Sequence, residues 1–410
     1  MTVSARPMEP APAPGAGRSD AVPRARHYQG LQLFANSFRP FFLLGAIYAA
    51  IVMLVWLPVF YGEVSLTSAF APRDWHVHEM LYGYLPAAIT GFLFTAIPNW
   101  TGRLPIRGLP LATLVAVWGA GRLEVTFSAE SGWLTALLVD AGFLALVAAA
   151  AAREILAGSN WRNLPVVMLI LLLLAGNVAF HLEVHLRGNA DYGLRIGISV
   201  VVLLIALIGG RVIPSFTRNW LVKENPGRLP VPFGRFDMIT IAVSAVALVA
   251  FIVRPDSQVT AAALALAGLL HVVRLSRWAG DRTLRERLLL ILHVGYGFVP
   301  LGFVLGAAAS FGVLPASAAS HAWMAGAAGT MTLAVMTRAT LGHTGQQLTA
   351  SRPTQAIYAA IVVAALARIC AIIDPAYSDA LLHLAGLAWV AAFAGFAVVY
   401  GPLLLGRRRA

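Results

Sequence analysis

Long apolar runs follow one another along almost the whole chain, and short segments rich in charge, glycine or proline separate them. A transmembrane helix needs about 20 mostly apolar residues to cross about 30 Å of hydrocarbon. Twelve runs approach or reach this length, and we expect a helix in each. The runs cover residues 41–61, 78–98, 110–126, 133–151, 164–181, 194–214, 237–253, 259–278, 288–311, 319–338, 356–373 and 380–404. The pattern predicts an all-α integral membrane protein.

Residues 1–30 have a different pattern, without an apolar run long enough to be buried. Prolines and glycines interrupt this segment at Pro7, Pro10, Pro12, Pro14 and Gly15. Such a composition is typical of a disordered segment. We therefore expect a disordered tail over 1–30 and a single twelve-helix membrane domain over 31–410.

The composition supports the membrane prediction. Hydrophobic residues make up 59% of the 410 residues and charged residues 12%, whereas soluble domains have about 45–50% and about 25%. An ordinary soluble enzyme is therefore excluded. The only cysteine, Cys370, excludes an internal disulfide and any four-cysteine metal site.

The net charge of +12 would suggest a nucleic-acid partner in a soluble protein. Here, however, the basic residues lie in short loops, and twenty-four of the thirty Lys and Arg fall on one side of the predicted helices. Four fall on the other side, and Arg122 and Arg368 lie within spans. Positive loops face the cytoplasm. We therefore expect a lipid bilayer as the partner, no nucleic acid, and both termini in the cytoplasm.

Six of the ten histidines fall at one membrane level, the outer one in this orientation. They are His76, His78, His181, His185, His321 and His383. Histidine is the commonest metal ligand, and polar groups within spans often mark a functional site. The six are therefore candidates for binding haem or another metal, the alternative being hydrogen-bonded side chains at headgroup depth.

The spacing of these histidines adds detail. His181 and His185 are four residues apart, so both would lie on one helix face and could bind one ion. His76 and His78 are two residues apart, roughly 200° around a helix, so they would not bind the same ion. A histidine-rich site with one cysteine favours haem iron or copper over thiolate chemistry.

Five charged groups fall in the outer half of the spans: Glu79, Arg122, Glu124, Asp140 and Arg368. Arg122 and Asp140 are expected to pair across two helices. Their role is either structural pairing or an outer polar cavity that carries protons or holds haem propionates.

The inner ends of the second, sixth and tenth predicted helices are alike, which suggests three four-helix units. The segments are 96–103, 211–220 and 334–345. Three four-helix arcs resemble the catalytic subunit of haem–copper oxidases, in which the second and tenth helices supply the axial histidines of a haem. His78 and His321 are the first choice for that role here. The chain lacks that family's adjacent histidine pair and the copper histidine of its sixth helix, so a conventional oxygen-reducing site is not expected.

Several stretches resemble the NnrS family of haem- and copper-containing bacterial membrane proteins. They are Phe38-Arg39-Pro40-Phe41-Phe42, Trp75-His76-Val77-His78-Glu79-Met80, Pro98-Asn99-Trp100-Thr101-Gly102-Arg103, Gly210-Arg211-Val212-Ile213-Pro214-Ser215-Phe216-Thr217, Leu292-His293-Val294-Gly295-Tyr296, Val335-Met336-Thr337-Arg338 and Leu341-Gly342-His343-Thr344-Gly345. The resemblance implies haem and copper, the bacterial cytoplasmic membrane, and protection from nitric oxide and its products. It adds His293 and His343 as second-tier metal candidates. Glu79, Arg122, Asp140 and Arg211 are expected as supporting polar residues.

The sequence is compatible with two functions. The first is a redox protein that binds or turns over nitric oxide and protects against nitrosative stress, with an electron donor that the sequence does not identify. The second is a secondary transporter of metal or haem, because twelve spans with both ends inside are also a common transporter plan. A non-catalytic sensor ranks last, because no appended soluble domain is evident.

Overall fold

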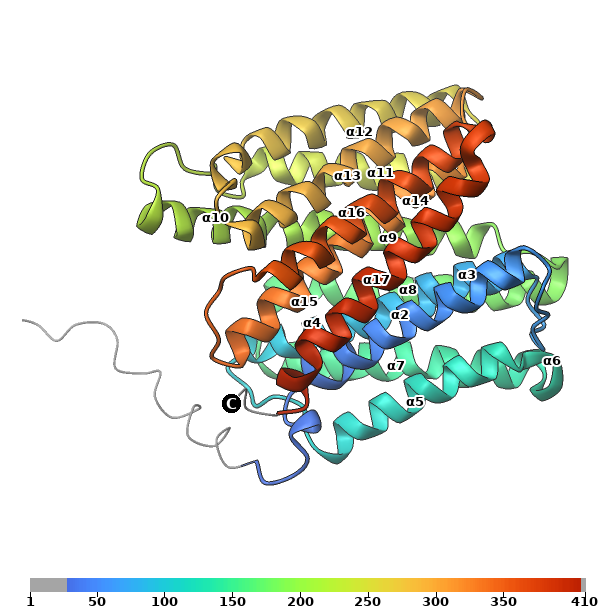
Figure 1. Cartoon of the computed structure of the whole chain (residues 1–410), viewed down its shortest axis with the longest axis horizontal. Helices are drawn as coiled ribbons and strands as arrows, with labels where there is room; N and C mark the ends of the chain where they lie inside the picture. Colours follow the sequence, from blue (N-terminus) through green and yellow to red (C-terminus); the bar gives the residue numbers. More distant parts are fainter. Residues whose placement is uncertain (1–27, 407–410) are drawn as a thin grey trace, which may run out of the picture.

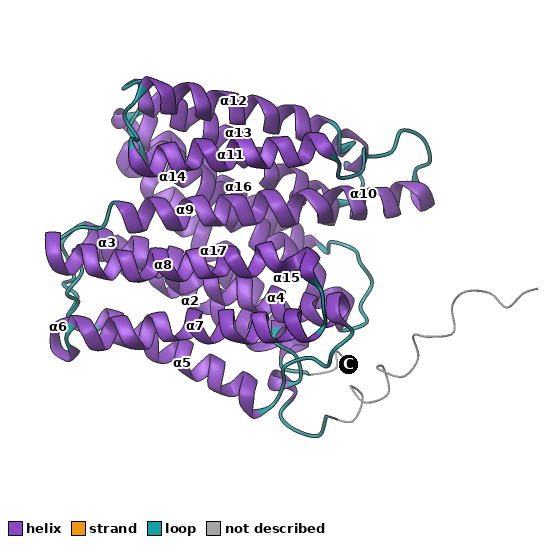
Figure 2. Cartoon of the chain, turned by 180° about the vertical axis from the view of Figure 1, so that it is seen from behind, coloured by secondary structure: helices purple, strands orange, loops and turns teal. Residues whose placement is uncertain are grey.

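The computed structural model describes residues 28–406, which are largely helical and contain no strand within that range. The tail predicted for residues 1–30 therefore falls almost wholly outside the described residues. The long helices lie side by side along one direction (Figures 1 and 2). Helices α3, α6 and α14 lie at one end of the bundle, which we call the α3 end, and α10 lies at the other, the α10 end, together with the C-terminal part of the chain.

Most helices begin and end within about six residues of the predicted boundaries, but the sixth continues to Glu224, ten residues past its expected end at 214. Their bounds are α2 Phe38–Phe60, α3 Pro72–His78, α4 Leu85–Thr101, α5 Leu109–Thr126, α6 Ser128–Ser131, α7 Trp133–Ala157, α8 Leu164–Arg187, α9 Tyr192–Leu204, α10 Gly210–Glu224, α11 Arg235–Val253, α12 Gln258–Ser276, α13 Arg287–Ser310, α14 Ser317–His321, α15 Thr330–His343, α16 Arg352–Ile373 and α17 Ser378–Leu404. Proline in the first turn starts several of them, as at Pro110 and Pro165, where its missing N–H leaves no helical bond unmade.

Ten helices of the described part are long and apolar enough to cross a membrane. Large apolar side chains such as Val246, Val259 and Val398 face outwards, which suits lipid rather than water. The chain is thus a multi-pass membrane protein. Two of the expected spans are not among the ten. The third expected span corresponds to α5, which carries Arg122 and Glu124. The tenth corresponds to the helix over Ser317–His343, which is rich in small residues. The count of twelve stays a prediction.

Three of the long helices each consist of two α-helical parts joined by a π-helical segment. They are α3–α4, α9–α10 and α14–α15. These segments are η2 (Glu79–Tyr84), η4 (Ile205–Gly209) and η6 (Ala322–Gly329). We call the three the π-turn helices. They are the second, sixth and tenth predicted helices. All three contact one another: α4 contacts α15, and α9 contacts both η2 and η6. The recurrence agrees with three four-helix units, while the likeness to haem–copper oxidases stays a prediction.

A buried arginine from a neighbouring helix packs against a glycine at two of the π-helical segments. Arg122 lies against Gly83 of η2, and Arg274 lies against Gly210 directly after η4. A π-helical segment leaves backbone groups free for other partners; the carbonyl of Ala206 in η4 accepts a hydrogen bond from Arg274 Nη1 at 2.8 Å. Glycine at these positions therefore makes room for a guanidinium inside the bundle.

We expect Gly83→Ala and Gly210→Ala to lower the unfolding temperature of the purified protein. A Cβ at either position would overlap a guanidinium that is held in place by buried acidic partners, and such overpacking typically costs about 1–3 kcal/mol. Gly142→Ala is the matched control, because no atom lies within 4 Å of its added Cβ. Equal unfolding temperatures for all three variants in a thermal-shift assay would show that the guanidinium groups are not tightly packed against Gly83 and Gly210.

Candidate metal centre

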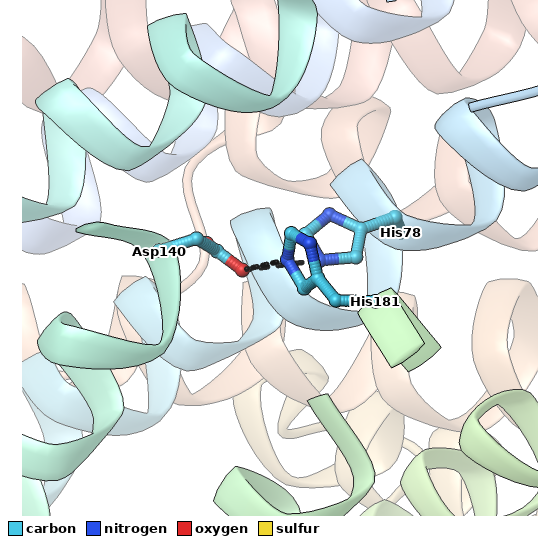
Figure 3. Close-up of side chains that lie close together, drawn as sticks. All are labelled: His78, Asp140 and His181. Atoms are coloured by element: carbon cyan, nitrogen blue, oxygen red, sulfur yellow. Dashed lines mark hydrogen bonds and ion pairs between the residues drawn. The ribbon is translucent and has the colours of Figure 1, made fainter. Parts of the chain in front are cut away.

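A buried cluster of two histidines and an aspartate lies near the α3 end. His78 comes from the last residue of α3, Asp140 from α7 and His181 from the C-terminal part of α8. Asp140 Oδ2 is 3.1 Å from the Nε2 atoms of both His78 and His181 (Figure 3). All three side chains are at most 1% exposed. One carboxylate oxygen thus joins two imidazoles inside the bundle.

Further polar side chains fix the positions of this cluster. Asn177, one turn before His181 on α8, donates to Asp140 Oδ2 at 2.8 Å and places its own carbonyl oxygen 2.9 Å from His78 Nε2. The other ring nitrogen of His78, Nδ1, is 3.0 Å from Glu79 Oε1. Both ring nitrogens of His78 therefore face oxygen acceptors, which orients the ring.

Arg122 on α5 supplies the positive charge of the site. Its Nη1 donates to both carboxylate oxygens of Glu79, at 3.0 and 2.9 Å, and its Nη2 donates to Asp140 Oδ1. The predicted pair between Arg122 and Asp140 is thus confirmed, and Glu79 joins it. The hydroxyl of Tyr48 donates to Glu79 as well.

With both carboxyl groups ionised, Glu79 and Asp140 carry two negative charges against the one positive charge of Arg122. A buried charge is costly unless it is compensated. A proton bound by the cluster, on a carboxylate or an imidazole, or a bound metal ion would supply the missing charge.

The donor atoms fit a metal ion. One ligand atom each from His78, Asp140 and His181 lie within 4.8 Å of one another. Metal-binding histidines commonly donate their second nitrogen to a carboxylate, and Glu79 holds His78 in that way. The second nitrogen of His181, Nδ1, is buried without a hydrogen-bond partner in the described residues. The rings of Phe70 and Phe180 pack edge-on against the imidazoles and shield them.

A separate cavity of about 640 Å³ at the same end contains two other predicted histidines. His76 of α3 and His321 of α14 line it together with Trp56, Met80 and Arg368. Most of its wall is apolar. His76 and His78 therefore face different sites, as their spacing predicts. The geometry favours His76, rather than the first choice His78, as the partner of His321.

The two cavity histidines differ in their hydrogen bonds. His321 Nδ1 is 2.7 Å from the carbonyl oxygen of Ser317, so this nitrogen is the N–H donor and Nε2 keeps its lone pair. The ring of His76 stacks on Trp56, with centroids 4.3 Å apart, and its Nδ1 is buried without a partner in the described part. Both imidazoles are therefore available as ligands.

The other predicted residues lie apart from these two sites. His185 is exposed and stacks on Trp133, so it does not join His181. His383 is exposed and close to Tyr61. His293 is buried, with Nε2 3.0 Å from the Thr217 hydroxyl. His343 and Arg211 line a second cavity, near the α10 end.

Sequence reasoning missed Asn177, Tyr48 and Trp56 as parts of these sites. A signal existed only for Asn177, which is an amide in an apolar helix four residues before His181. The hydroxyl of Tyr48 and the ring of Trp56 lie on α2 among many other apolar residues, and nothing in their spacing distinguishes them.

Comparison with known proteins gives a match over nearly the whole chain. A family model described as NnrS protein matches residues 32–408. No curated protein matches the chain.

We expect Arg122→Gln to destabilise the protein strongly, because it leaves Glu79 and Asp140 without their cation. Removing one partner of a buried ion pair costs about 3–5 kcal/mol. Arg187→Gln removes an exposed arginine 4.0 Å from Glu183, where a loss of about 0–1 kcal/mol is expected. Thermal unfolding in detergent measures both, and a similar small shift for the two variants would contradict the assigned charge balance.

Proposed function

The chain belongs to the NnrS family, and we propose that it is a haem- and copper-containing membrane protein that binds nitric oxide and protects against nitrosative stress. The observation that carries the proposal is the pair His76 and His321. They come from two of the three π-turn helices and line one apolar cavity. A large apolar cavity with a few convergent polar groups is the usual form of a cofactor site.

His76 and His321 would hold the haem iron in this cavity. The carbonyl of Ser317 fixes the tautomer of His321 and so leaves Nε2 for the metal. Trp56 fixes the plane of the His76 ring by stacking. A haem bound there would supply an iron atom that could bind nitric oxide in place of one of the two histidines.

Arg368 supports the same cavity as an anion partner. It lies on α16 within a membrane span and forms no ion pair or hydrogen bond with the described residues. A partly buried guanidinium without a counter-charge is unfavourable, and a haem propionate would supply that charge. The mostly apolar wall lowers the local polarity and so strengthens this attraction.

The buried cluster is the proposed copper site, with His78, Asp140 and His181 as ligands. Imidazole suits copper, and a cation among these atoms would balance the second carboxylate charge. Glu79 holds the far nitrogen of His78, while Arg122 holds Glu79. These residues keep the ligands oriented whether or not the protein turns nitric oxide over.

The proposed orientation follows the distribution of basic residues. The loops at the α10 end carry the larger share of Lys and Arg, so this end faces the cytoplasm. Both metal sites then lie towards the outer side of the bacterial cytoplasmic membrane.

Transport of metal or haem is the second candidate. One observation favours it: cavities lie near both ends of the bundle, and the π-turn helices pass between them. Uptake of copper or haem into proteoliposomes containing the purified protein tests this function directly. Flux at the level of empty liposomes would remove it.

We expect wild-type protein from haem-replete cells to show a Soret band that shifts with nitric oxide, and His76→Ala and His321→Ala to lose it. Each variant removes one ligand while the surrounding packing stays apolar. His383→Ala, an exposed histidine near the α3 end, should keep the band. Unchanged spectra in both His76→Ala and His321→Ala would exclude the pair as haem ligands.

We expect His181→Ala and Asp140→Asn to lower the copper content of the purified protein at least tenfold without removing the Soret band. The two sites have separate ligands, so copper loss need not release haem. His185→Ala is the matched control, because it changes a histidine one turn further along α8 that lies outside the cluster. Copper per protein from elemental mass spectrometry decides the question; equal losses in the control would point to copper bound elsewhere.

A further inference from the structure

A second cavity, of about 540 Å³, lies near the α10 end, where the three π-turn helices converge. The three similar segments singled out in the sequence all reach it. The first contributes Asn99 and Trp100, the second contributes Arg211, and the third contributes Arg338 and His343. None of these residues lines the cavity that holds His76 and His321.

Two arginines make the lining of this cavity positively charged. Arg211 and Arg338 line it from different helices, and neither forms an ion pair or a hydrogen bond with the described residues. Arg211 Nε is buried without a partner. Each guanidinium instead lies over an aromatic ring, Arg211 over Phe233 at 5.3 Å and Arg338 over Phe216 at 4.3 Å. These contacts leave the hydrogen-bond donors of both groups free.

The surroundings of the two arginines are short of negative charge. The charged groups that act on Arg211 are two further arginines, Arg162 and Arg274. The acidic group that acts on Arg338 is Glu286, which caps the start of α13 by accepting from the Leu288 amide at 3.0 Å and does not line the cavity. Burial raises the pKa of the Glu286 carboxyl.

We propose that this cavity binds an anionic oxygen group, a phosphate or a carboxylate, between Arg211 and Arg338. Arginine donates two parallel hydrogen bonds to such groups. A partly buried guanidinium without an ion-pair partner is unfavourable, and an anion bound in the cavity that both arginines line would supply that partner. Asn99, Asn163 and His343 line the same cavity and offer further polar contacts.

The rest of the wall indicates the shape of the ligand. Phe42, Phe92, Ile208 and Leu292 line the cavity beside the polar groups. An acidic phospholipid would place its headgroup at the arginines and its chains along these side chains. A soluble anion such as inorganic phosphate would use the arginines alone. The chemistry at the guanidinium groups is the same, so an experiment has to separate the two sources.

The test uses the full chain, purified in a neutral detergent and stripped of lipid. Three probes are titrated at constant ionic strength: phosphatidylglycerol, phosphatidylcholine and inorganic phosphate. The readouts are the unfolding temperature and the number of lipids retained in native mass spectrometry. Arg211→Gln and Arg338→Gln are compared with Arg218→Gln, which removes an exposed arginine from the same helix as Arg211.

We expect phosphatidylglycerol, but not phosphatidylcholine, to stabilise the wild type, with a half-saturating concentration about tenfold or more higher in either cavity variant. Arg218→Gln should behave as wild type. A response to inorganic phosphate that both cavity variants lose would support the proposal with a soluble anion as ligand. If the cavity variants respond to both anionic probes as Arg218→Gln does, the proposal is overturned.

Arg211→Lys and Arg338→Lys provide the check against misfolding. Lysine keeps the charge but cannot form the paired hydrogen bonds of a guanidinium, so weaker binding in a lysine variant that elutes as one species reports on the site rather than on the fold. These readouts do not involve haem or copper, so their failure is distinguishable from failure of the proposed function.

Discussion

The charge of two carboxylates inside the bundle is the constraint on which the α3 end depends. Glu79 and Asp140 are almost completely buried, and the one arginine that contacts both, Arg122, neutralises only one of them. Burial makes an uncompensated charge costly, so the arrangement is stable only with a further positive charge close by. The imidazoles of His78 and His181 lie where a proton or a metal ion supplies that charge. With both carboxyl groups ionised, this point therefore favours a bound proton or metal ion.

Accommodating arginines inside a helical bundle requires space that an unbroken α-helix does not offer. The π-turn helices provide it in two ways. The widened turns free backbone carbonyls, and Gly83 and Gly210 carry no side chain against the guanidinium groups. The same solution occurs at two of the three π-turn helices. The third, over Ser317–His343, instead places His321 at the cavity. The three π-turn helices thus share a backbone feature and differ in the side chains that they place beside it.

Much of this architecture could be predicted from the sequence, because hydrophobic length and periodicity act over whole helices. The positions of the helices, the pairing of Arg122 with Asp140 and the divergence of His76 from His78 all follow from spacing. What could not be predicted is which histidines meet. His181 and His185 share a helix face, yet Trp133 stacks on His185 near the end of α8 and the cluster contains only His181. Such outcomes depend on how each neighbouring helix is rotated about its own axis. The hydrophobic pattern of one sequence does not determine that rotation.

The two histidines of α3 connect the two candidate metal sites through one short helix. His76 and His78 are two residues apart on α3, so their side chains leave the helix about 200° apart. One therefore lines the larger cavity and the other joins the buried cluster. Because α3 is held by the ion pairs of Glu79, the same carboxylate that orients His78 also fixes where His76 enters the cavity. Changes at the closed cluster thus reach the open cavity through the position of α3.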